Sequence, residues 1–73
     1  MKNGYGLCHT ATGMFYHDYD GGSYLFEFSA VPVSRKQIEE ILSTFDKYIE
    51  IDNYIAAKTK ERVLKSEFQI VEI

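Results

Sequence analysis

The sequence contains one cysteine, one proline and no tryptophan, and these shortages narrow what the chain can do. Cys8 alone cannot form an internal disulfide, and no group of cysteine and histidine residues has the spacing of a structural zinc site. No run approaches the roughly 20 apolar residues of a membrane-spanning helix. The Met-Lys-Asn-Gly start also lacks the apolar stretch of a secretory signal. We therefore expect a cytoplasmic protein that has no membrane contact and no covalent cross-link.

The length of 73 residues predicts one small domain over residues 1–73. A content of 45% hydrophobic and 15% aromatic residues excludes a disordered chain, which would be poor in both. A chain of this size buries only about 60% of its unfolded surface, and no disulfide or metal adds to that stabilisation. Such a thin core favours a homodimer or a large protein partner, and it leaves little room for a deep active site.

Two aromatic-rich segments near the N-terminus predict a β-hairpin. Residues 14–18 and 24–29 are rich in strand-forming residues, and aromatic side chains alternate along the second segment. Between the two segments, residues 20–22 (Asp-Gly-Gly) supply the positive φ values of a tight turn. Residues 4–13 are rich in glycine and threonine, and we expect either an irregular entry or the frayed start of a strand.

A helix is predicted over about residues 35–47. Ser34 and Gln37 have the spacing of a capping box, in which each side chain bonds to the backbone of the other residue. Apolar residues then recur at helical spacing and form one stripe, which should pack on a sheet. We expect Leu42 and Phe45 to be buried. The stripe consists of Ile38, Ile41, Leu42, Phe45 and Ile49.

Two interpretations are open for the chain beyond this helix. Residues 48–51 and 54–57 fit a hairpin with a two-residue loop, whereas Asp52 could instead cap a second helix. We favour the hairpin, followed by a helical turn within 59–66 and a final strand over 68–73. The predicted fold is α+β, with an N-terminal hairpin, one amphipathic helix and C-terminal strands, and with the helix packed on one face of an antiparallel sheet.

The polar residues match none of the common catalytic or cofactor-binding patterns. Cys8 and His9 are sequence neighbours, so on a strand their side chains would point to opposite faces, and His17 does not complete a metal site. Asp18 and Asp20 frame the predicted turn, where aspartate usually bonds to its own backbone. The chain also has no glycine-rich phosphate-binding loop. We predict a non-enzymatic protein with no catalytic residue, no cofactor and no metal.

Carboxylates and tyrosines are the candidate partner-binding groups. Glu39, Asp46 and Glu50 would align along one side of the predicted helix, because they recur at i, i+7 and i+11. Such a row can imitate DNA phosphates toward a basic protein; a solvated helix face is the alternative explanation. Tyrosine suits interfaces, because it offers a large contact area and a polar tip. The candidate contact residues are Glu39, Glu40, Asp46, Glu50, Tyr16, Tyr19, Asp18 and Asp20.

The stretch from residue 20 to residue 50 has an order of motifs that is found in a known family. An Asp-Gly turn and Tyr24 come first, and the segment 31–34 (Val-Pro-Val-Ser) leads into the amphipathic helix. This order resembles that of small phage proteins that inhibit the host uracil-DNA glycosylase. In that family a tyrosine-rich hairpin runs into a helix, and the members are acidic, dimeric DNA mimics.

The resemblance implies an inhibitor of a host nucleic-acid enzyme, and anti-CRISPR proteins are neighbours in the same broad class. It transfers no contact residue, because Gln37 and Ile38 stand where the family has acidic and aromatic contact residues.

The leading hypothesis is therefore a non-enzymatic inhibitor of phage or mobile-element type that binds a host nucleic-acid-processing protein or a CRISPR effector. We expect no direct binding to nucleic acid, because the net charge of −3 repels phosphate. The alternative is a small nucleic-acid-binding or regulatory module that uses the basic residues near the C-terminus. A third possibility is a dimer-forming domain. The basic residues are Lys58, Lys60, Arg62 and Lys65.

Overall fold

The computed structural model describes residues 4–54 and 61–73, and within them it shows an α+β fold. The elements are β1 (Tyr5–His9), β2 (Met14–Tyr19), β3 (Gly22–Phe26), α1 (Arg35–Ser43), β4 (Tyr48–Ile51), β5 (Asn53–Tyr54), β6 (Glu61–Leu64), the 3₁₀ turn η1 (Lys65–Glu67) and β7 (Phe68–Glu72).

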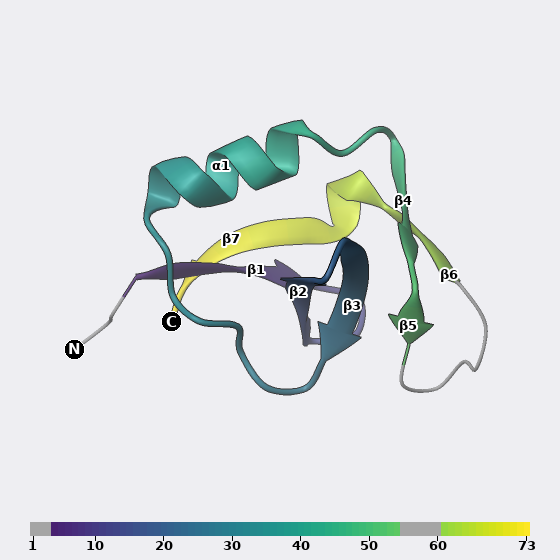
Figure 1. The fold of residues 1–73 in the computed structure, drawn as a ribbon, viewed down its shortest axis with the longest axis horizontal. Helices are drawn as coiled ribbons and strands as arrows, with labels where there is room; N and C mark the ends of the chain where they lie inside the picture. Colours follow the sequence, from purple (N-terminus) through teal and green to yellow (C-terminus); the bar gives the residue numbers. More distant parts are fainter. Residues whose placement is uncertain (1–3, 55–60) are drawn as a thin grey trace.

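One sheet has the strand order β5-β3-β2-β1-β7, and β4 and β6 form a separate antiparallel pair. All pairs are antiparallel except the short pair of β3 with β5. Helix α1 contacts β1 and β7 and covers one face of the sheet (Figure 1). The predicted α+β class and the packing of the helix on the sheet are confirmed.

The predicted N-terminal hairpin is formed by β2 and β3. The strands pair from Phe15 with Phe26 to Tyr19 with Gly22. Only Asp20 and Gly21 lie between the strands, and both have positive φ values of 52° and 77°. Two such residues in succession match the right-handed twist of the flanking strands, which explains the Asp-Gly sequence at this turn.

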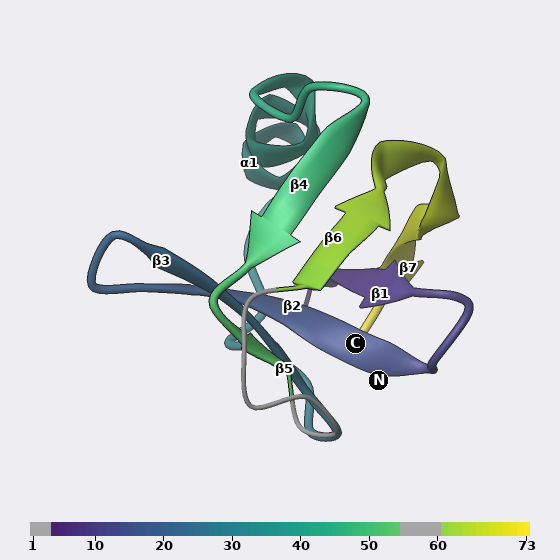
Figure 2. The ribbon, with the colours of Figure 1, turned by 90° about the vertical axis from the view of Figure 1, so that its right-hand side faces the viewer.

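The hairpin projects from the body of the protein, as Figure 2 shows for the loop between β2 and β3. Residues 5–9 form a strand of their own, β1, which is neither the irregular entry nor the frayed strand start that we expected. Strand β1 pairs with β7 along its whole length but with β2 only at two positions. Near the start of β1, Tyr5 instead forms an isolated antiparallel β-bridge with Val33. The hairpin is therefore held by β1 at one end and by β5 along β3, and its turn at residues 19–21 is exposed.

Helix α1 begins as the capping box predicts. The Ser34 hydroxyl accepts a hydrogen bond from the Gln37 backbone N–H, and the Gln37 side-chain oxygen accepts one from the Ser34 backbone N–H, both at 3.2 Å. These bonds satisfy backbone donors that the first turn of a helix leaves without partners. The local sequence signal is sufficient to place this end of the helix.

The predicted helix end at residue 47 is wrong, because α1 ends at Ser43. The backbone N–H groups of Thr44 and Phe45 still donate to carbonyls of the last turn. The chain then leaves the helix and buries Phe45 in the core. Ile49, which was assigned to the helical stripe, lies instead on β4.

The predicted hairpin of 48–51 with 54–57 is also wrong in its described part. Strand β4 pairs with β6, from Tyr48 with Leu64 to Ile51 with Glu61. The chain after β4 does not reverse, because Asp52 holds it beside β3: its carboxylate accepts the Ser23 N–H at 2.8 Å, and its own N–H donates to the Ser23 carbonyl at 2.7 Å.

The rest of the C-terminal prediction has a mixed outcome. Positions 53–54 form β5, so no helix begins directly after Asp52, while residues 55–60 lie outside the described residues. The helical turn predicted within 59–66 corresponds in part to η1. The final strand is confirmed as β7.

The core lies between α1, the helix-facing side of the sheet and the β4–β6 pair. The rings of Tyr16, Phe45 and Phe68 meet edge-to-face at its centre, with centroids 5.2 to 6.1 Å apart. Leu42, predicted to be buried, is half-buried at the core margin. No helix of the described residues is long and apolar enough to cross a membrane. The buried apolar residues are Leu7, Tyr16, Leu25, Ile38, Phe45, Ile51, Val63 and Phe68.

Candidate functional site

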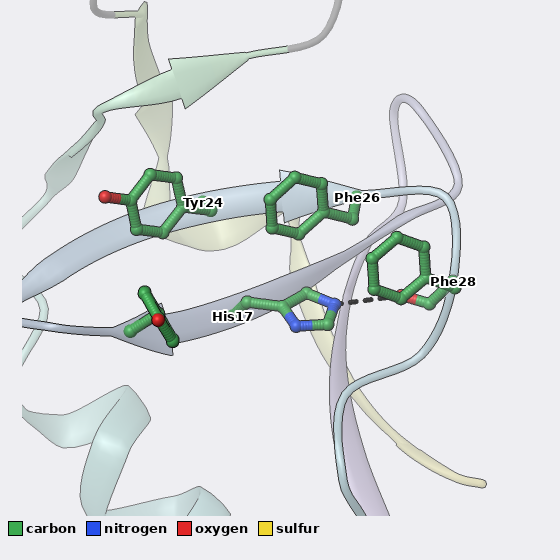
Figure 3. Close-up of a pocket in the computed structure, with 5 residues that line it drawn as sticks. His17, Tyr24, Phe26 and Phe28 are labelled. Atoms are coloured by element: carbon green, nitrogen blue, oxygen red, sulfur yellow. Dashed lines mark hydrogen bonds between the residues drawn. The ribbon is translucent and has the colours of Figure 1, made fainter.

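The side of the β2–β3 hairpin that faces away from α1 carries a group of exposed rings. Alternation along the strands turns Tyr16 and Leu25 toward the core and the neighbouring residues outward. Tyr19 and Phe28 are the most exposed of these rings, at 70% and 65%. We call this group the aromatic face, and it lines a shallow hollow of about 440 Å³ (Figure 3). It consists of His17, Tyr19, Tyr24, Phe26 and Phe28.

The rings of the aromatic face hold one another in place. Phe26 stacks on Tyr24 and on Phe28, with centroids 5.9 and 5.1 Å apart and nearly parallel planes. His17 meets Phe26 and Phe28 edge-to-face at 4.9 and 5.1 Å. Tyr19 packs against Tyr24 at 6.4 Å. A partner would therefore meet rings that are already ordered, which reduces the entropy lost on binding.

A hydrogen bond extends this order beyond the end of β3. The His17 Nε2–H donates to the Phe28 carbonyl at 2.9 Å, as the dashed line in Figure 3 marks. Because a carbonyl can only accept, this bond places a proton on Nε2. It keeps Phe28 beside the sheet although Phe28 lies outside the strand.

The aromatic face is apolar at its centre, and one exposed carboxylate, Asp20, lies at the turn beside it. No lysine, arginine or carboxylate among the described residues lines the hollow. Asp18 and Glu27 alternate to the opposite side of the strands, while Asp20 lies exposed at the turn next to Tyr19. Apolar patches with a polar rim are typical of protein-binding surfaces.

The predicted acidic row of Glu39, Asp46 and Glu50 does not exist as one stripe on a helix. Because α1 ends at Ser43, Asp46 lies in the connection to β4 and Glu50 lies on β4. Glu39 remains on the helix, where its carboxylate is 3.4 Å from the Arg35 guanidinium. The alignment assumed a helix that continues past Phe45.

The structure nevertheless brings other predicted carboxylates together around two hollows of about 300 and 320 Å³. Asp18 and Glu40 line the first hollow, and Asp46 and Glu50 line the second. The two hollows adjoin, because both are lined by Tyr16 and Thr44. We call Asp18, Glu40, Asp46 and Glu50 the carboxylate cluster; these residues come from β2, α1, the connection after it and β4.

Tyr16, predicted as a contact residue, belongs to the core instead. Its ring is only 8% exposed and packs on Phe45, and its hydroxyl lies 3.0 Å from the Ser23 hydroxyl. Burial raises the pKa of Tyr16 above its ordinary value of 10.0; the Ser23 hydrogen bond opposes this, and the charges of Asp18 and Asp52 add to it. Tyr19 and Asp20, by contrast, are exposed at the hairpin turn.

The raised pKa of Tyr16 predicts an alkaline loss of stability. The unfolded tyrosine releases its proton near pH 10, and the folded one only at a higher pH. The contribution of neutral Tyr16 to stability is therefore complete below pH 10, and it is lost as the pH rises through the pKa of the folded state. Tyr16→Phe should flatten this decline above pH 10 in urea unfolding followed by circular dichroism. Tyr48→Phe, on an exposed tyrosine, should keep the wild-type slope. Equal slopes in both variants would contradict the prediction.

A second polar group, not predicted from the sequence, surrounds His9. This side chain is 2% exposed; its Nε2–H donates to the Glu67 carboxylate at 3.0 Å, and its Nδ1 lies at hydrogen-bond distance, 2.8 Å, from the Thr12 hydroxyl. The order hydroxyl, imidazole, carboxylate resembles a nucleophile with its base. However, the Thr12 oxygen also accepts the Met14 N–H, and Thr10 donates twice to the Glu67 carbonyl. The group therefore anchors the β1–β2 turn to η1.

The other candidate groups are placed as follows. Cys8 and His9 point to opposite faces of the sheet, as predicted: Cys8 lies opposite Phe15, and His9 lies opposite Met14 and Phe68. The described residues contain no group of three or more potential metal ligands. Of the basic residues near the C-terminus, Lys58 and Lys60 lie outside the described residues. The Arg62 guanidinium lies 5.5 Å from the Tyr48 ring, and the Lys65 ammonium donates to the Phe45 carbonyl at 3.3 Å.

Comparison of the chain with protein-family models, with curated proteins and with solved structures finds no match. The likeness of residues 20–50 to phage inhibitors of uracil-DNA glycosylase therefore stays a prediction from the sequence.

Proposed function

We propose that this protein is a non-enzymatic inhibitor of phage or mobile-element type, which binds a nucleic-acid-processing or defence protein in the host cytoplasm and blocks it. The observation that carries the proposal is the aromatic face. Ordered tyrosine and phenylalanine rings are exposed there on a projecting hairpin, where a monomer gains nothing from their exposure. Clustered aromatic side chains beside an exposed carboxylate are well suited to act as the centre of a protein interface.

The charge of the chain favours a partner with a basic groove. The net charge is −3, Asp20 stands at the tip of the hairpin, and the carboxylate cluster begins on the other side of β2 at Asp18. A basic groove that normally holds DNA could receive the hairpin, with carboxylates in place of phosphates. In this proposal DNA mimicry uses carboxylates from several elements, and not one row along a helix.

The experiment compares two variants with the same change of net charge. The test variant combines Asp18→Asn, Glu40→Gln and Asp46→Asn, which removes three charges from the carboxylate cluster. The control combines Glu39→Gln, Glu61→Gln and Glu72→Gln, which are exposed residues elsewhere. A partner captured from host lysate with the wild-type protein is purified, and its affinity for each variant is measured at several salt concentrations, with duplex DNA as a competitor.

We expect the test variant to bind more weakly and with a smaller salt dependence than the control, and we expect DNA to displace the wild-type protein. The loss of three ion pairs at a partly buried interface should weaken partner binding about tenfold or more. Equal affinities of the two variants, or simultaneous binding of DNA and this protein to the partner, would overturn the mimicry. Tight binding of nucleic acid by the purified protein itself would favour the alternative that uses Arg62 and Lys65.

A further inference from the structure

A hollow of about 520 Å³ is lined by residues from the end of α1, the connection to β4, the end of β6 and η1. Leu42, Leu64 and Phe68 provide its apolar lining, and Lys47, Lys65 and Ser66 provide its polar groups. Its volume is in the range of small-molecule sites, which are mostly apolar with a few polar groups. It shares no lining residue with the aromatic face or the carboxylate cluster.

The charge in this hollow has one sign. Both ionisable residues that line it are lysines, and no carboxylate among the described residues does so. Asp46 precedes Lys47 in the sequence but lines a different hollow, and the Glu67 carboxylate next to Ser66 is bonded to His9. An anion would therefore meet two ammonium groups here without an opposing carboxylate in the lining.

Contacts within the protein restrain both lysines. The Lys65 ammonium donates to the Phe45 carbonyl at 3.3 Å, which engages one of its three donors. The Lys47 ammonium lies 5.7 Å from the centre of the Tyr48 ring. Tyr48 and Leu64 are cross-strand partners of β4 and β6, so this ring lies on the same side of the pair as Leu64. Both lysines therefore line the hollow with ammonium groups that have a partner nearby within the protein.

We propose that this hollow binds a small amphipathic carboxylate. Its acyl chain would lie on the aliphatic carbons of Leu42 and Leu64 and on the ring of Phe68, while its carboxylate accepts hydrogen bonds from Lys47 and Lys65. An aliphatic chain fits better than a polar ring, because the lining offers no hydrogen-bonding group other than the two lysines and Ser66. This site goes beyond the proposed inhibitor function and does not depend on it.

The probe is octanoate, compared with 1-octanol and octylammonium, which have the same chain and a neutral or positive head. Binding is followed by methyl NMR of Leu42 and Leu64 in the full-length protein. We expect saturable shifts of these methyl groups. Octanoate should bind about tenfold more tightly than octanol, because its carboxylate forms charge-assisted hydrogen bonds with the lysines. Octylammonium should bind most weakly, because both lysines repel it.

Two pairs of substitutions separate the local site from net charge. Lys47→Met with Lys65→Met keeps much of the apolar stems, and octanoate should then bind no better than octanol. Arg35→Met with Lys36→Met removes the same charge at the opposite end of α1 and should leave octanoate binding unchanged. Because Lys65→Met also removes the bond to Phe45, Ser66→Asp is a second variant that adds a repelling carboxylate and keeps that bond.

Equal binding of octanoate and octanol by the wild-type protein would overturn the site. Unchanged Leu42 and Leu64 methyl signals together with octanoate shifts of the Phe26 and Phe28 ring signals would also overturn it, since the ligand would then occupy the aromatic face. A Ser66→Asp variant with unchanged octanoate affinity would also contradict the proposal, whether or not the double lysine variant folds.

Discussion

Replacing Phe45 by alanine is expected to lower the free energy of unfolding by about 3–5 kcal/mol, the usual cost of removing a buried phenylalanine ring. Phe45 is 8% exposed, and its ring lies 5.2 Å from that of Tyr16 and 5.6 Å from that of Phe68. Its removal leaves a cavity between the helix, the sheet and the start of β4. Because small domains are stable by only about 5–15 kcal/mol, a large fraction of the stability of this chain would be lost.

Urea unfolding followed by circular dichroism measures this change, and Leu42→Ala is the matched control. Leu42 lies in the last turn of α1 and is only half-buried, so its loss should cost less, about 1–2 kcal/mol. Phe45→Leu gives an intermediate value if the alanine variant no longer folds. A loss at Phe45 no larger than that at Leu42 would mean that the three-ring contact does not hold the core together.

The beginning of the helix could be predicted and its end could not, for a physical reason. A capping box is a contact between residues three positions apart, so Ser34 and Gln37 identify it without the rest of the fold. The apolar spacing continues through Phe45 and Ile49, but it does not show whether these side chains lie on a helix or on a turn and a strand. The packing of Phe45 on Tyr16 and Phe68 decides between them, and that contact depends on the tertiary structure.

The candidate site could be predicted only in part for the same reason, because its residues are brought together by the tertiary structure. Alternation in 24–29 predicted that aromatic residues share one side of the strand, but Leu25 is also apolar, so alternation alone does not show which side faces the core. The carboxylate cluster could not be derived by helical spacing, because its members lie on several elements. Asp52 looked like a turn or cap residue, and only its bonds to Ser23 show that it joins β5 to β3. The tie between His9 and Glu67 spans 58 positions and has no local signal.

Replacing Tyr19 and Phe28 together by serine is expected to weaken binding of the captured partner by about 100-fold or more. These rings are the most exposed of the aromatic face, and buried aromatic residues at the centre of an interface typically contribute 2 kcal/mol or more each. Stability should fall but the protein should stay folded, because the lost rings contact only Tyr24, Phe26 and His17, and an aromatic pair contributes about 0.5–1.5 kcal/mol. Calorimetric titration gives the affinity, and urea unfolding of the same samples gives the stability.

Val31→Ser is the control for this prediction, because Val31 is an exposed apolar residue that lines neither the aromatic face nor the two hollows of the carboxylate cluster. It should leave partner affinity within a few-fold of wild type. Sedimentation equilibrium tests the competing occupant, a second copy of this chain, which the sequence also led us to expect. If the wild-type protein is a dimer at micromolar concentration and the Tyr19/Phe28 variant is a monomer, the aromatic face joins two copies. If the variant binds the partner as tightly as wild type, the partner uses another surface, and the carboxylate cluster becomes the preferred contact.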